Sequence, residues 1–220
     1  MELFEKDLEK LNIIDTYNKI ETPLGSIYFS VQTDNTYIDT TTISEYINQS
    51  LDGKTIYRWE NYNFEAEFMS YKPINHIPDG MVVDDCIAVA WRLRAKKTIN
   101  APIEFKCIWD KNYVWKDYGA NSGEYLDAQT WEDGIHYVTI GTEDGEYLFI
   151  RSKMDRMIPR CLQSRDADLG LVQYSELGLT VPIPCMEANE TCHIQFVVSW
   201  GKSEIATWYA VGQTSNEFFV

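Results

Sequence analysis

Apolar residues recur at every second position over much of this chain, in short runs separated by turn residues. The clearest run spans residues 86–94. Its larger apolar side chains fall on one face, and these are Ile87, Val89, Trp91 and Leu93. A period of two belongs to the β strand, in which successive side chains point to opposite faces of a sheet. The pattern therefore predicts a chain built from many short strands.

Further runs of this kind predict the other strands. They span residues 25–32, 35–43, 64–68, 103–109 and 113–117. Two hairpins are also predicted from alternation on both sides of a turn. The first joins residues 135–140 to 146–151 through Asp144-Gly145, and the second joins residues 193–200 to 204–213 through Gly201-Lys202-Ser203.

Three segments have helical spacing instead. Phe4, Leu8 and Leu11 predict an N-terminal helix over about residues 2–14. Residues 44–51 could form a short helix with Ser44 as its N-cap, and apolar residues over 152–162 predict another, interrupted by Pro159.

The predicted fold class is mainly β, a β-rich α+β protein with two packed antiparallel sheets arranged like a sandwich. A short N-terminal helix and one or two further short helices accompany the sheets. No linker, low-complexity run or solenoid-length repeat divides the sequence. Residues 1–220 are therefore expected to form one domain.

The charge of the chain restricts its partners. Nineteen Lys and Arg against 34 Asp and Glu give a formal net charge of −15. A field of this sign repels nucleic acid and anionic membranes, so neither is expected as a partner. The N-terminus lacks a signal-peptide pattern, and the odd count of five cysteines contains no Cys-x-x-Cys pair. We therefore expect a cytoplasmic protein with free thiols.

No motif in the sequence specifies catalytic residues, a metal or a cofactor. The segment 119–123 resembles no nucleophile elbow and is interpreted as a flexible turn. Cys185, Cys192 and His193 do not have zinc-site spacing, and Cys192 and His193 should point to opposite faces of a strand, with the thiol buried and the imidazole exposed. A hydrolase built on two non-contiguous carboxylates stays open, because 34 acids always supply a suitable pair.

The stretch from residue 117 to 146 combines acids and aromatic rings and contains no Lys or Arg. Aromatic anchors surrounded by carboxylates suit a basic protein partner; the alternative is a solvated loop region whose rings fold into the core. The candidate partner-binding residues are Asp117, Glu124, Asp127, Trp131, Glu132, Asp133, Glu143, Asp144 and Glu146. A basic segment follows, containing Arg151, Lys153, Arg156, Arg160 and Arg165. It is expected to pair with part of the acid excess, although Arg156 and Arg160 could instead bind an anion.

Three functions are compatible with these features. The first is a non-enzymatic, acidic inhibitor or immunity-type protein that neutralises a basic toxin or nuclease. The second is a carbohydrate-binding or carbohydrate-acting β-sandwich, since sugars stack on exposed Trp and Tyr rings. The third is a structural or assembly subunit, for instance of a phage-like particle. The sequence leaves the oligomeric state open.

Overall fold

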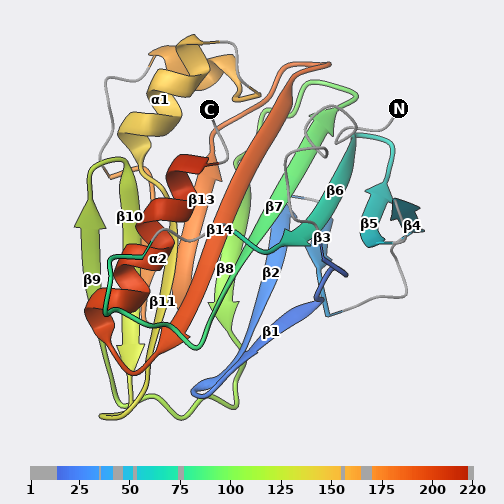
Figure 1. Cartoon of the computed structure of the whole chain (residues 1–220). Helices are drawn as coiled ribbons and strands as arrows, with labels where there is room; N and C mark the ends of the chain where they lie inside the picture. Colours follow the sequence, from blue (N-terminus) through green and yellow to red (C-terminus); the bar gives the residue numbers. More distant parts are fainter. Residues whose placement is uncertain are drawn as a thin grey trace.

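Two antiparallel β-sheets pack face to face in the computed structural model (Figure 1). This architecture confirms the predicted fold class. The structure describes residues 14–34, 36–41, 47–51, 54–73, 77–154, 157–164 and 170–217. The predicted N-terminal helix lies almost entirely outside these residues.

The smaller sheet has the strand order β1-β2-β8-β13-β12, and β3 also pairs with β2. Its strands are β1 (Lys19–Thr22), β2 (Gly25–Thr33), β3 (Thr36–Asp39), β8 (Ile103–Trp109), β12 (Gln173–Ser175) and β13 (Gly178–Ile183). The predicted strands 25–32 and 103–109 are thus confirmed. Of the strand predicted over 35–43, the described residues 36–41 form β3 only as far as Asp39.

The larger sheet has the order β4-β5-β6-β7-β14-β11-β10-β9. Its strands are β4 (Ile47–Leu51), β5 (Lys54–Glu60), β6 (Phe64–Tyr71), β7 (Asp85–Ala95), β9 (Asp117–Gly123), β10 (Leu126–Glu132), β11 (Tyr137–Glu143) and β14 (Thr191–Gly201). Strand β9 forms one edge, and it pairs with β10 at all seven of its positions.

The main core lies between the sheets. The apolar face predicted for residues 86–94 points into it, with Trp91 and Val89 opposite Ile194 and Phe196 of β14. Phe29 contributes from the smaller sheet and packs against Phe68 and Phe196. A second apolar cluster covers the outer face of the larger sheet. Part of that cluster comes from helix α2 (Glu204–Glu217), which lies across β10, β11 and β14 (Figure 1).

Both predicted hairpins are wrong in their second strand. Residues after Asp144 form helix α1 (Gly145–Lys153), because the Asp144 side chain caps it by accepting a hydrogen bond from the Tyr147 N–H. Residues after Ser203 form α2, which begins in the same way, with the Ala206 N–H donating to Ser203 Oγ. In both places a side-chain cap starts a helix where a short alternation of apolar and polar residues had predicted a strand.

Four further local predictions are corrected. Residues 47–51, expected in a short helix, form the strand β4 paired with β5. The helix expected over 152–162 is instead the end of α1 and a separate 3₁₀ helix at Arg160–Ser164, with Met157 at φ 47° between them. The expected flexible turn at 119–123 belongs to β9, and of the strand expected over 113–117 only Asp117 is in a strand.

Candidate functional site

A pocket of about 550 Å³ lies between the edge strand β9 and helix α2. Three consecutive residues of β9 form one wall, and residues of the first two turns of α2 form the other. The lining residues are Ala120, Asn121, Ser122, Glu204, Ile205, Trp208 and Tyr209. Because α2 crosses the outer face of the sheet next to its edge, the pocket is open to solvent.

Aromatic rings dominate the helical wall of the pocket. Trp208 and Tyr209 are half-buried, and their rings meet edge to face with centroids 5.4 Å apart. Trp208 lies over Gly123 so closely that a Cβ at that glycine would come within 2.9 Å of the indole. Ile205, which is 59% exposed, adds an apolar surface beside the two rings. The Trp208 ring is therefore held against the sheet, and the pocket presents apolar faces to whatever enters it.

A chain of hydrogen bonds orients the polar groups of the pocket. Asn121 Nδ2 donates to Thr130 Oγ1 (2.9 Å), which is hydrogen-bonded to Thr139 Oγ1 (2.9 Å). The Thr139 hydroxyl is also hydrogen-bonded to Thr207 Oγ1 (2.8 Å), and the Thr207 hydroxyl donates to the Glu204 carbonyl (2.9 Å). All three threonines are buried. The chain links β9, β10, β11 and α2, so it fixes the first turn of the helix relative to the edge strand.

The same arrangement places an amide and a carboxylate side by side at the pocket. Asn121 Nδ2 also lies 3.3 Å from Glu204 Oε1, and Glu204 is exposed. The remaining oxygen of Glu204 and the Asn121 carbonyl are acceptors, and Ser122 adds a hydroxyl. The pocket thus combines stacking surfaces with a few oriented polar groups, which is the usual composition of a small-ligand site.

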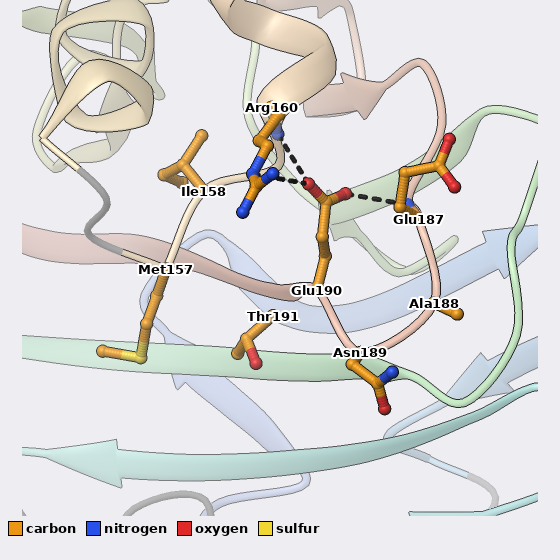
Figure 2. Close-up of a pocket in the computed structure, with 8 residues that line it drawn as sticks. All are labelled: Met157, Ile158, Arg160, Glu187, Ala188, Asn189, Glu190 and Thr191. Atoms are coloured by element: carbon orange, nitrogen blue, oxygen red, sulfur yellow. Dashed lines mark hydrogen bonds and ion pairs between the residues drawn. The ribbon is translucent and has the colours of Figure 1, made fainter.

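A second pocket, of about 410 Å³, lies between the segment at residues 157–160 and the turn that precedes β14 (Figure 2). Its central feature is Glu190, whose carboxylate accepts hydrogen bonds from the backbone N–H groups of Arg160 (3.1 Å) and Glu187 (2.8 Å). The Arg160 Nε lies 3.9 Å from the same carboxylate. Since its carboxylate already binds backbone groups, Glu190 ties two segments together, and the β9–α2 pocket is the stronger ligand site.

The nine candidate partner-binding residues do not form one surface. Strand register places Asp117 opposite Glu132, and Asp133 follows in the β10–β11 turn. The other acids gather at the opposite end of these strands, and they are Glu124, Asp127, Glu143, Asp144 and Glu146. Seven-residue strands separate the two groups by about 20 Å.

Four of the nine are buried. Trp131 packs against Trp109 in the core and donates its indole N–H to the Glu176 carbonyl (2.9 Å), so its ring folds inward. Burial raises the pKa of Asp127, which accepts a hydrogen bond from Tyr174, and also raises the pKa of Asp144, the cap of α1. Burial raises the pKa of Glu143 to about 7, although Arg151 opposes this shift.

Two of the three described positions of the basic segment pair with acids, and the third, Lys153, lies with its ammonium 3.7 Å from the centroid of the Phe149 ring. Arg151 is buried against Glu143, and Arg160 lies beside Glu190. Arg156 and Arg165 fall outside the described residues. As predicted, Cys192 and His193 point to opposite faces, but the expected exposure of the imidazole is wrong, since His193 is fully buried beside Arg92.

The residues that the structure describes contain neither a metal cluster nor a membrane-spanning helix. No group of three or more His, Cys, Asp or Glu side chains in these parts of the chain is arranged to hold a metal ion. No helix in the described ranges has the length and apolar character needed to cross a bilayer.

No family model and no curated protein matches the sequence. Among solved structures, the chain is similar to a protein from the human microbiome assigned as a kojibiose phosphorylase, with 8% identity over 95% of this chain and a TM-score of 0.47. It is also similar to a polysaccharide lyase (9% identity, 87% of this chain, TM-score 0.42) and to a bacterial glucoamylase complexed with acarbose (11% identity, 94% of this chain, TM-score 0.47).

The chain spans less than a third of the length of each of these proteins, namely 28%, 28% and 31%. All three TM-scores lie below 0.5.

Sequence reasoning missed the β9–α2 pocket because it placed both walls in the wrong secondary structure. One signal could have identified the helix. Ser203 is a good N-cap residue, and Ala206 and Ala210 follow it at a spacing of four, with both side chains buried against the sheet. No comparable local signal identified β9, whose composition of Gly, Ala, Asn and Ser is typical of a turn.

Proposed function

We propose that the protein binds a carbohydrate in the β9–α2 pocket. The observation that carries this proposal is the fixed pairing of an aromatic wall, Trp208 and Tyr209, with the oriented side chains of Asn121 and Glu204. A sugar ring has an apolar C–H face and an equatorial belt of hydroxyl groups. It can therefore stack on an aromatic ring while its hydroxyl groups bond to amide and carboxylate oxygens.

The pocket favours binding over hydrolysis. Most glycoside hydrolases use two carboxyl groups that flank the scissile bond. Glu204 is the only carboxylate among the described residues that line this pocket. Asn121 hydrogen-bonds to the Glu204 carboxylate and orients it. The conformational entropy of both side chains is therefore lost when the protein folds and not when a ligand binds. Such pre-organisation suits recognition of a neutral sugar.

Replacement of the stacking ring tests this proposal. In a glycan screen followed by titration of tryptophan fluorescence, the wild-type protein should respond to at least one sugar, and Trp208→Ala should weaken that response at least tenfold. Glu204→Gln, at an exposed position, should also weaken binding without unfolding the protein. Tyr62→Ala is the matched control, because Tyr62 is a 76% exposed ring in the β5–β6 turn and does not line the pocket. Equal sugar affinity in Trp208→Ala and the wild type would exclude this site.

A basic protein partner is the second candidate, favoured by one end of the sheet. There, Asp117 and Glu132 lie opposite each other, and Ile135 in the adjacent turn is 62% exposed. An exposed apolar side chain beside acids resembles, on a smaller scale, the apolar anchors surrounded by carboxylates that the sequence predicts for a basic partner. Inhibitor and immunity-type activity would belong to this end of the molecule.

A further inference from the structure

A pair of cysteines lies close in sequence to residues that line the pocket in Figure 2. Cys161 belongs to the 3₁₀ helix next to Arg160, and Cys185 precedes the turn that contains Glu187 and Glu190. The Cys161 thiol donates to the Cys185 carbonyl, with Sγ and O 3.1 Å apart. Both residues are half-buried, whereas Cys86, Cys107 and Cys192 are buried.

Hydrogen bonds to Glu190 hold together the two segments that carry these cysteines. Glu190 accepts backbone hydrogen bonds from Arg160, which precedes Cys161, and from Glu187, which follows Cys185 by two residues. Burial raises the pKa of Cys161 to about 11, and the neighbouring Cys185 thiol adds to this rise. The backbone segments that a disulfide would join are therefore already tied together, although they are 24 residues apart in the sequence.

We propose that Cys161 and Cys185 form a reversible intramolecular disulfide when the protein meets a glutathione-type disulfide. The Cys185 sulfur attacks one sulfur of oxidised glutathione, which forms a mixed disulfide and releases one glutathione. The Cys161 sulfur then attacks Cys185 Sγ, forms the Cys161–Cys185 bond and releases the second glutathione. The two thiol protons are taken up by the two glutathione thiolates, so two protein thiols are oxidised as one glutathione disulfide is reduced.

The order of these steps follows from the geometry and acidity of the pair. The high pKa of Cys161 makes it a poor first nucleophile, since the thiolate is the reactive form. As the second nucleophile it needs no diffusion, because its sulfur already lies 3.1 Å from the carbonyl oxygen of Cys185. The product closes a chain loop between α1 and β14 and fastens together the two walls of the pocket in Figure 2.

The test is thiol mapping of the folded protein after incubation with oxidised glutathione. Free thiols are blocked with a maleimide, and peptides are then identified by mass spectrometry. We expect a linked Cys161–Cys185 peptide, with Cys107 remaining a thiol in its buried site. Cys161→Ser should stop at a glutathione adduct on Cys185. Free thiols at both positions, or adducts on both without a link, would overturn the proposal.

Thermal unfolding provides a second measurement that does not depend on peptide recovery. Closing the loop should raise the Tm of the oxidised wild type by ~5–10 °C over the reduced form. Cys161→Ser and Cys185→Ser should each lose this redox-dependent shift, and Cys107→Ala, the control at a buried cysteine, should keep it. A shift that persists in Cys161→Ser would assign the effect to another pair of cysteines.

Discussion

Single residues of the larger sheet show how burial and charge compete in this acidic protein. Glu143 and Arg151 are both at most 2% exposed in their side chains and form an ion pair between β11 and α1. Burial raises the pKa of Glu143 and lowers that of Arg151, which means that desolvation outweighs the mutual attraction for both partners. The pair positions α1 and adds little net stability at neutral pH.

This balance predicts a pH dependence of stability. The folded-state pKa of Glu143, about 7, lies above its ordinary value of 4.5. Its contribution is therefore fully present below pH 4.5 and is lost as the pH rises through 7. The free energy of unfolding of the wild type, measured relative to that of Glu143→Gln by urea titration, should fall by at most roughly 3 kcal/mol over this range.

Glutamine has nearly the same shape as glutamate and does not titrate. All other acids contribute equally to both proteins, so the difference between their free energies of unfolding reports the titration of Glu143. A constant difference between the two proteins from pH 4.5 to 8 would contradict the assignment.

At the scale of elements, the contact between α2 and the larger sheet creates the proposed sugar site. Helix α2 approaches β11 at Gly141, where a Cβ would come within 2.3 Å of Val211 Cγ1. Leu126 and Ala128 of β10 complete this contact. A glycine in the strand thus allows the helix to lie flat on the sheet, and the pocket depends on that position.

Gly141→Ala should consequently lower the free energy of unfolding by about 1–3 kcal/mol, because the added methyl group overlaps the helix. It should also weaken sugar binding, since α2 has to shift. Gly119→Ala is the control on the edge strand β9, where a Cβ has no atom within 4 Å. Urea unfolding and the fluorescence titration measure the two effects, and a Gly141→Ala protein as stable as Gly119→Ala would refute the contact.

At the scale of the whole molecule, the negative charge is distributed over two ends of the β9-β10-β11 region. One end carries Asp117, Glu132 and Asp133, and the other carries Glu124 and Glu146. Asp133 also holds its turn by accepting hydrogen bonds from the Ile135 and His136 backbone N–H groups, which lowers its pKa to about 2. Asp133 is therefore left unchanged in a test for a basic partner. Glu132 accepts one backbone hydrogen bond in the same turn, from the Gly134 N–H (2.6 Å), so a Glu132 variant is first checked for an unchanged fold by circular dichroism.

Charge reversal at one end at a time should therefore locate any basic protein partner. We expect Asp117→Lys with Glu132→Lys to abolish salt-sensitive capture of a partner from lysate, and Glu124→Lys with Glu146→Lys to leave it intact. The matched pairs change the net charge equally, so a loss in both would indicate long-range attraction and not a defined interface.

An assembly subunit, the third hypothesis, predicts self-association. Light scattering over a concentration series should then show growing mass, and a strict monomer at all concentrations would contradict this hypothesis.

The sequence by itself determined the two-sheet architecture and most of the core. Alternation over residues 86–94 and 194–200 identified β7 and β14 and the side chains that they bury, because a period of two is a local property of each strand. Tertiary structure alone decided which acids meet and where α2 lies. Asp117 and Asp144 belong to one acidic stretch of sequence, yet strand length places them at opposite ends. Asn121 and Glu204 are 83 residues apart, yet they share a hydrogen bond, since long-range pairing of strands and helix packing are not encoded in any local pattern.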